Sequence, residues 1–289
     1  MPELPEVEVV RRSLQSFING LKIKKVTIFN RNLRYKIKSN FERIIEHQKI
    51  IIVKRRSKFL LLGLENNFII LIHLGMTGKM FISKEKFKKI LKTSFYFESK
   101  MNKKHNHFII QFNNKVKLIY NDVRKFGFIK LISPNQQHTN NHLQNLGPEP
   151  LNSEFNYIYL NKKIRNIKKN TKSLLMDQKI VSGLGNIYVN EILNLSSINP
   201  KKISKNLSLV ETKKIVRNTK ITLKKAISLG GSSIRDFKGV SGNNGNFQQN
   251  FMVYNRSDQM CKKPGCRGLI KKIYISNRST FYCLKCQNS

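Results

Sequence analysis

Two residues at the start of the chain, Pro2 and Glu3, have the functional groups and position for covalent chemistry. Removal of Met1 would leave Pro2 with a secondary amine. An α-amino group has a pKa near 8, against about 10.4 for lysine, so more of it is neutral and nucleophilic at pH 7. Glu3 beside it could donate or accept the protons that such a nucleophilic attack moves. From the pattern alone, an ordinary helix-capping segment is the favoured interpretation.

The four cysteines form two pairs, Cys261-x4-Cys266 and Cys283-x2-Cys286, with sixteen residues between the pairs. Apolar runs at 269–275 and 280–282 predict a β-hairpin between them. A hairpin can place four thiolates tetrahedrally around one Zn²⁺, and so short a segment has almost no core without the metal. We therefore expect one structural zinc ion. Free or disulfide-bonded cysteines explain the ligand spacing poorly.

The charge of the chain points to a polyanionic partner. Lysine and arginine number 55 against 16 aspartate and glutamate, which gives a formal net charge of +39. Such an excess causes self-repulsion unless it is neutralised, and nucleic acid is the first candidate partner. An AT-biased genome, which enriches lysine, asparagine and isoleucine, explains part of the same excess without any function.

Length and hydropathy indicate a multidomain protein without a membrane-spanning segment. A chain of 289 residues suits two domains and a small appended module. No apolar run reaches the roughly 18 residues that span a bilayer. The N-terminal MPELPEVE, with its prolines and glutamates, lacks the basic and apolar character of a signal peptide. We therefore expect no membrane association and a cytoplasmic location.

The elements that must position these residues change character along the chain. Pro5 and an apolar stripe through Val7, Val10, Leu14 and Phe17 predict a leading helix. Short apolar runs then predict a β-sandwich or barrel-like domain, with strands at 22–29, 50–53, 59–64, 68–72, 108–112, 116–120 and 126–132.

The second half of the chain has helical spacing. A polar stretch within 133–150 predicts a linker, and helices are expected at 154–168, 172–180, 186–195 and 207–229. Two other segments lack a pattern. Residues 83–107 are lysine-rich and fit a long exposed loop or insertion, and the glycine- and asparagine-rich 239–246 fits a mobile loop.

Seven motifs, in order along the chain, resemble those of bacterial formamidopyrimidine-DNA glycosylases: MPELPEVE, RRSKFLLL, HLGMTG, DVRKFG, LGPEPL, LMDQKIVSGLGNIYVNE and RSTFYCLKC. The resemblance implies an α+β multidomain fold: a β-sandwich catalytic domain at 1–132, a linker at 133–150, a helix–two-turn–helix domain at 151–240, and a loop with a zinc finger at 241–289. It also implies a monomeric enzyme that acts on damaged double-stranded DNA.

The resemblance assigns roles to individual residues. Pro2 would be the nucleophile that forms a Schiff base with the damaged nucleotide, Glu3 the acid that helps open the sugar, and Glu6 part of the same pocket. Lys58 would contact a phosphate beside the lesion and support catalysis. Asn186 and Arg278 would grip the flanking phosphates, and a turn before a helix gives Asn186 amide donors for that purpose.

A base that leaves the helical stack leaves a gap to be filled. Met76, Arg124 and Phe126 resemble the residues that do this, with Phe126 as an apolar wedge and Arg124 as a donor to the estranged cytosine. Core packing is the alternative for Met76 and Phe126, although nearby glycines favour exposed turns. The histidines His73, His105 and His107 fit structural or phosphate-side positions better than metal ligation.

The implied activity is excision of oxidised purines, 8-oxoguanine and formamidopyrimidines, followed by strand cleavage through β,δ-elimination. Several positions depart from the family pattern and put the fine selectivity in doubt: Val123, Lys125, Asn246, Asn255 and a longer 83–104 stretch. Two alternatives stay open. An endonuclease VIII-like enzyme would prefer oxidised pyrimidines, whereas a non-enzymatic zinc-ribbon protein would account for charge and cysteines but not for the N-terminus.

Overall fold

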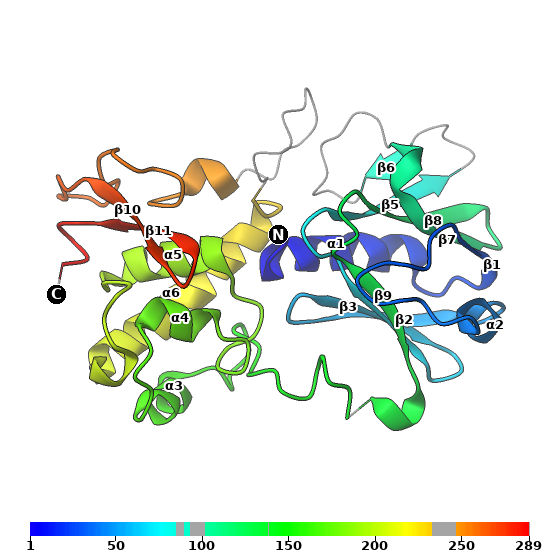
Figure 1. Cartoon of the computed structure of the whole chain (residues 1–289), viewed down its shortest axis with the longest axis horizontal. Coiled ribbons are helices and arrows are strands. Elements are labelled where there is room, and N and C mark those ends of the chain that lie inside the picture. Colours follow the sequence, from blue (N-terminus) through cyan, green and yellow to red (C-terminus); the bar gives the residue numbers. More distant parts are fainter. Residues whose placement is uncertain (85–89, 93–101, 138, 233–246, 289) are drawn as a thin grey trace. The chain divides into compact units, whose positions relative to one another are not determined.

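The computed structural model describes residues 1–84, 90–92, 102–137, 139–232 and 247–288 (Figure 1). The chain divides into two compact units, each built from two chain segments. The first comprises Met1–Gln144 with Gly230–Asn246, and the second Asn145–Leu229 with Phe247–Ser289. The domain boundaries expected from the sequence stay a prediction.

The first unit begins with helix α1 (Leu4–Ile18), as the sequence predicts. Glu3 is its N-cap, and Glu6 completes a capping box with it, which satisfies amide groups that the first turn leaves without helical partners. Val7, Val10 and Leu14 are buried along one face. This face packs against strands β2 (Ile50–Arg56) and β3 (Phe59–Leu64), so the helix anchors the N-terminus to the sheet.

Two antiparallel sheets form the predicted β-sandwich. One has the order β1-β7-β8-β5-β6 and the other β2-β3-β4-β9. Their inward side chains share one apolar core with α1 and the short helix α2 (Phe41–Ile45). The remaining strands are β1 (Ile23–Ile28), β4 (Ile69–His73), β5 (Gly78–Lys84), β6 (Ile90–Lys92), β7 (Asn106–Phe112), β8 (Val116–Asp122) and β9 (Phe128–Ile132).

The expectation of a loop over 83–107 is wrong at 83–84, 90–92 and 106–107, which are strand residues, whereas 102–105 form a largely exposed turn. β5 continues to Lys84, the three-residue β6 pairs with it, and β7 begins at Asn106. A three-residue strand is too short to show an alternating hydrophobic pattern, so its sequence does not predict it. It forms because its backbone pairs with β5 at the edge of the sheet. Residues 85–89 and 93–101 lie outside the described residues.

The second unit is helical and ends in the predicted hairpin. Its helices are α3 (Tyr157–Ile164), α4 (Thr171–Met176), α5 (Asn186–Ser196) and α6 (Leu209–Ser228), and its strands are β10 (Ile270–Ile275) and β11 (Arg278–Cys283). Caps fix where the helices begin: Asn156 accepts the amide of Tyr159, and Ser208 forms a capping box with Glu211. No helix among the described residues is long and apolar enough to cross a membrane.

Candidate functional site

The N-terminal residues predicted to do chemistry are held tightly. Pro2 is buried, and Glu3 and Glu6 are 3% and 1% exposed. Glu6 Oε2 accepts the Glu3 amide at 2.8 Å, while its Oε1 accepts the amide and hydroxyl of Ser232 at 2.8 and 3.0 Å. Gly231 has φ +82° with Glu6 against it, so the close approach depends on glycine. Glu6 therefore bridges the start of α1 to the segment that follows α6.

The β2–β3 hairpin that carries Lys58 is fastened to the same helix. Glu8 forms ion pairs with Arg11, Arg12 and Arg55, and Arg55 also donates to the carbonyl of Ser57 at 2.9 Å. Burial alone would raise the pKa of Glu8, but hydrogen bonds and charges of these arginines hold it below its ordinary value. Glu8 thus stays ionised and fixes the turn beside Lys58.

Lys58 is only 8% exposed, although lysine is rarely buried. Burial and the nearby Lys58 charge lower the pKa of His73 to about 4, so this imidazole is neutral at physiological pH. Neutral His73 accepts the amide of Gly75 at 3.1 Å through Nδ1. The histidine therefore orders the loop that begins after β4, as expected for a structural position.

Met76, Arg124 and Phe126 lie on two loops that touch. Met76 follows β4 and is 44% exposed, whereas Arg124 and Phe126 follow β8, where Phe126 is 46% exposed. The guanidinium of Arg124 lies over the Phe126 ring at 4.4 Å. Exposure of large apolar side chains excludes the core-packing alternative for Met76 and Phe126. The structure thus presents an apolar and cationic projection from one place in the first unit.

The two other histidines differ in position. His105 ends a short 3₁₀ turn, η2 (Lys103–His105), and is partly exposed just ahead of β7. His107 is buried and donates from Nε2 to the carbonyl of Asp122 at 2.7 Å. His107 is therefore a structural residue, whereas the DNA-side position of His105 stays a prediction.

In the second unit, Asn186 and the turn of the finger hairpin lie in contact. Asn186 opens α5 after Gly185, and its Nδ2 donates to the carbonyl of Ser279 at 3.0 Å. Ser279 follows Arg278, which begins β11 and is exposed. The structure therefore places Asn186 against the residue that follows Arg278, the other residue that the sequence assigns to phosphate contacts.

A buried cation that the sequence analysis missed holds this hairpin turn. Lys172 is fully buried, and its ammonium donates to the Ser279 carbonyl at 3.0 Å and to Thr280 Oγ1 at 2.6 Å, with the Arg278 carbonyl at 3.5 Å. Nothing in the local pattern distinguishes it from the exposed lysines nearby. It forms one side of a hollow of about 700 Å³ whose lining includes the cations Lys168, Lys169, Lys172, Lys201 and Arg278.

We expect Lys172→Met to lower the free energy of unfolding by about 1–3 kcal/mol, because buried finger oxygens lose a donor. Duplex binding should weaken with it. Lys168→Met removes the same charge from an exposed position on the same hollow and is the matched control. Denaturant unfolding of both variants measures the effect, and equal stabilities would contradict the positioning role of Lys172.

A second residue that the sequence analysis missed is Glu191 on α5. Its buried carboxylate accepts the amides of Met252, Val253 and Tyr254 at 2.7, 3.0 and 2.8 Å, and burial raises its pKa. These donors fix the start of the finger on the helix. The next residue, Asn255, has φ +60°, a left-handed conformation that asparagine tolerates well. The absence of glycine there is thus compatible with the local backbone.

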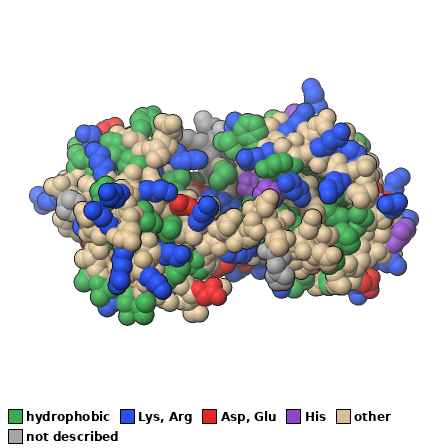
Figure 2. Space-filling view, turned by 60° about the horizontal axis from the view of Figure 1, so that its bottom comes forward, with side chains coloured by type: hydrophobic (Ala, Val, Ile, Leu, Met, Phe, Trp, Pro, Cys, Tyr) green, Lys and Arg blue, Asp and Glu red, His purple; other side chains and the backbone are tan. Residues whose placement is uncertain are grey.

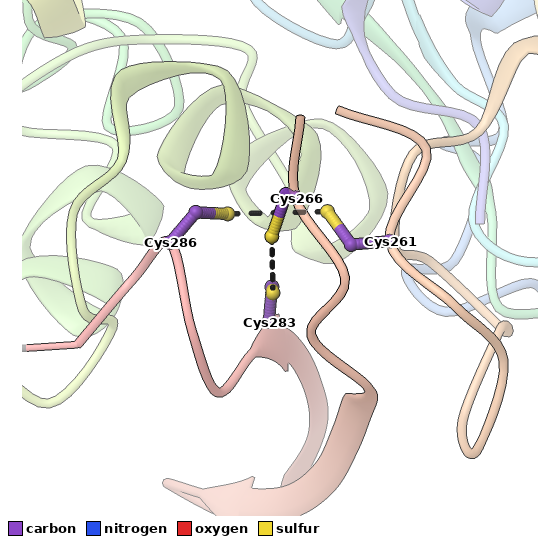
Figure 3. Close-up of side chains that lie close together, drawn as sticks. All are labelled: Cys261, Cys266, Cys283 and Cys286. Atoms are coloured by element: carbon purple, nitrogen blue, oxygen red, sulfur yellow. Dashed lines mark hydrogen bonds between the residues drawn. The ribbon is translucent and has the colours of Figure 1, made fainter. Parts of the chain in front are cut away.

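The four cysteines converge on one point, as Figure 3 shows. Their sulfurs lie within 4.8 Å of one another, with Cys261 and Cys286 at 3.9 Å and Cys266 and Cys283 at 3.5 Å. A tetrahedron with Zn–S bonds of about 2.3 Å requires sulfurs about 3.8 Å apart. The geometry fits one structural Zn²⁺, and the described thiols are not paired as disulfides.

The local environment affects the thiols differently. A hydrogen bond from the Gly268 amide lowers the pKa of Cys266 to about 7, which favours the deprotonated form that zinc binds, whereas burial raises the pKa values of Cys261 and Cys286. A Cβ on Gly268 would lie 2.7 Å from Cys283 Sγ, so the hairpin needs glycine for the sulfurs to approach. The finger packs on α5 through Asn190, which accepts the amide of Phe281 at 2.7 Å.

Basic side chains dominate the surface. Figure 2 shows lysine and arginine over both units on the visible face, with few acidic side chains among them. A formal net charge of +39 gives the protein a strongly positive electrostatic potential. This distribution suits a nucleic-acid backbone.

Comparison with known proteins agrees with this arrangement. Residues 1–129 match the Formamidopyrimidine-DNA glycosylase N-terminal domain, and residues 146–238 match the Formamidopyrimidine-DNA glycosylase H2TH domain. A Formamidopyrimidine-DNA glycosylase of Rickettsia bellii is 40% identical over 295 residues, with both chains covered completely. One from Wolbachia pipientis is 37% identical over 288 residues, again over the full length of both.

Solved structures show the same similarity. A point mutant of the Lactococcus lactis enzyme, in complex with a Fapy-dG containing DNA, superimposes with a TM-score of 0.86 at 33% identity and 100% coverage of both chains. The Lactococcus lactis enzyme with an abasic site containing DNA gives a TM-score of 0.85 at 33% identity, covering 99% of this chain and 100% of the other. Fold, four-cysteine cluster and full-length similarity agree, and this chain belongs to the formamidopyrimidine-DNA glycosylase family.

Proposed function

We propose that this protein removes oxidised purines, 8-oxoguanine and formamidopyrimidines, from duplex DNA and then cleaves the strand by β,δ-elimination. The observation that carries the proposal is the buried Pro2–Glu3 end of α1, fixed by Glu6. Full-length similarity to glycosylases, one of them bound to a Fapy-dG containing DNA, supports the substrate class.

The chemistry would start with the amine of Pro2, freed by removal of Met1. Its lone pair attacks C1′ of the damaged nucleotide, the bond from C1′ to the base breaks, and the departing base takes up the proton that the amine loses. Glu3 protonates the sugar oxygen as the ring opens, which yields the Schiff base. Lys58, held beside β2 and β3 by the Arg55 contact, binds a neighbouring phosphate. Elimination from the Schiff base then cleaves the strand.

The remaining residues would hold the DNA in the reactive geometry. Met76 and Phe126 fill the gap that the flipped nucleotide leaves, and Arg124 hydrogen-bonds the estranged base. Asn186 and Arg278 bind flanking phosphates, and the four-cysteine site holds Zn²⁺ to support the finger that carries Arg278. His105 contacts the DNA backbone from η2.

The partner would be damaged double-stranded DNA bound by a monomer in the bacterial cytoplasm. We propose that 1–132 is catalytic, 133–150 a linker, 151–240 the helix–two-turn–helix domain, and 241–289 the loop and finger. The Asn246 and 239–246 predictions lie outside the described residues.

Cleavage assays separate this proposal from its alternatives. We expect cleavage of duplex with 8-oxoguanine opposite cytosine to exceed cleavage of duplex with an oxidised pyrimidine. The reverse preference would indicate an endonuclease VIII-like enzyme. Binding without cleavage of either duplex would indicate a non-enzymatic nucleic-acid-binding protein.

Arg124→Ala should weaken discrimination for the base opposite the lesion, because a good bidentate base contact is worth about 1–3 kcal/mol. The measurement is kcat/KM on 8-oxoguanine paired with each of the four bases. Lys125→Ala, a neighbouring charge loss in the same loop, is the control. An equal fall against every opposing base would assign Arg124 a phosphate or packing role instead.

A further inference from the structure

The two loops that carry Met76, Arg124 and Phe126 meet through their backbones. Gly75 has φ +62°, and a Cβ there would lie 2.4 Å from the amide nitrogen of Gly127 and 2.5 Å from the carbonyl carbon of Phe126. Side chains larger than hydrogen are therefore excluded from this contact. The projection is built on two loops packed directly against each other.

Asp122, the last residue of β8, joins these loops by hydrogen bonds. It is fully buried, and Oδ1 accepts the hydroxyl of Thr77 from the loop after β4 at 2.5 Å. Oδ2 accepts the Gly127 amide at 2.9 Å and the Tyr120 hydroxyl at 3.1 Å. Thr77 Oγ1 in turn accepts the amide of Arg124 at 3.1 Å. One carboxylate and one hydroxyl thus connect both loops.

The pairing of β5 with β8 also keeps the two loops close to each other. In the pairing of β5 with β8, Gly78 lies opposite Asp122. The strand that follows Thr77 therefore starts directly beside Asp122. A Cβ on Gly127 would lie 1.9 Å from the Tyr120 hydroxyl, so the second loop packs so closely on this group that only glycine fits. Breaking the network would leave a buried carboxylate without its donors, a costly state that keeps the loops in one arrangement.

We propose that Asp122 and Thr77 are positioning residues that hold Met76, Arg124 and Phe126 as a single rigid wedge. The inference rests on the proposed function, because the wedge matters only to an enzyme that flips a nucleotide. Neither positioning residue needs to touch DNA. A loop pair locked before binding loses less entropy on entering the helix, so rigidity favours base extrusion and fixes Arg124 toward the opposing base.

Thr77→Val removes the bridging hydroxyl with little change in shape, and Thr77→Ser retains it. We expect Thr77→Val to lower kcat/KM on 8-oxoguanine duplex about tenfold and to erase the preference for cytosine opposite the lesion. Fluorescence of 2-aminopurine beside the lesion, which rises when stacking is broken, should increase less than with the unaltered enzyme. Thr77→Ser should restore all three readouts.

Three comparisons make the test specific. Cleavage of a pre-formed abasic site in single-stranded DNA, which has no opposing base, should stay within about twofold for Thr77→Val, as expected if the reactive amine is intact. Thr27→Val is the control for general destabilisation. It makes the same change on β1, which pairs with β7 and not with β5 or β8. Asp122→Asn should show the Thr77→Val defects more strongly, and Thr77→Val decides the case if Asp122→Asn does not fold.

The outcomes for the two proposals differ. If the unaltered enzyme fails to excise 8-oxoguanine, the proposed function is wrong. If it excises the base and Thr77→Val keeps both the cytosine preference and the full fluorescence rise, the positioning inference is overturned. Equal losses in Thr77→Val and Thr27→Val would also overturn it, since a general destabilisation would then explain the result.

Discussion

Protein that retains Met1 should bind lesion-containing duplex DNA but neither excise the base nor form a borohydride-trapped adduct. Retained Met1 turns the Pro2 nitrogen into an amide with no usable lone pair, whereas the basic residues that neutralise phosphates are unchanged. We expect excision and trapping to fall more than about a thousandfold. Affinity and its dependence on salt should persist, because that slope counts phosphate contacts.

The measurement is borohydride trapping on 8-oxoguanine duplex, with mass spectrometry to confirm the terminus of each preparation. Glu3→Gln is the companion variant, since it keeps the amine but removes the acid. It should lose base excision while still cleaving pre-formed abasic sites. If protein that retains Met1 is trapped as efficiently as processed protein, Pro2 is not the nucleophile, and Lys58 becomes the first candidate.

Loss of the zinc site should have the opposite effect to retention of Met1: DNA binding should be lost, while the reactive groups themselves are unchanged. We expect Cys283→Ser or strong chelation to raise the Kd for duplex DNA more than about a hundredfold, because the finger has little core without metal. The five residues in its buried cluster include two of the cysteines. Without the finger, Arg278 loses its fixed position beside Asn186.

Calorimetric unfolding with and without chelator checks that the loss of protein stability is confined to the second unit. The first unit has its own core and should keep its transition. Addition of Zn²⁺ should restore binding to chelated protein but not to Cys283→Ser. Chelated protein that binds duplex with unchanged affinity would contradict the role of the metal.

The sequence was most informative where a local pattern determines local structure. The stripe of α1, the alternation along the main strands and the spacing of the cysteines each predicted an element that the structure contains. The short helix α2, strand β5 and strand β6 were not predicted. β6 is too short to show a period, and pairing between β5 and β8 is decided by contacts between distant segments.

Supporting residues were harder to find than the proposed reactive ones. Lys172, Glu191 and Asp122 are ordinary polar residues in the sequence, and their importance comes from partners that lie far along the chain. Glu191, for example, binds amides about sixty residues away. Charge and composition cannot indicate such pairing, because burial is what makes these groups dependent on their partners.

The division of each unit into two chain segments affects how the protein is made. A ribosome that has released residues 1–144 has supplied the nine described strands of the sandwich, yet Ser232, which binds Glu6, is still to be synthesised. The Glu6 carboxylate in the first turn of α1 therefore acquires its final hydrogen bonds only after α6 has emerged. Truncation after Gln144 would yield a sandwich with an intact core and a Glu6 carboxylate deprived of two donors.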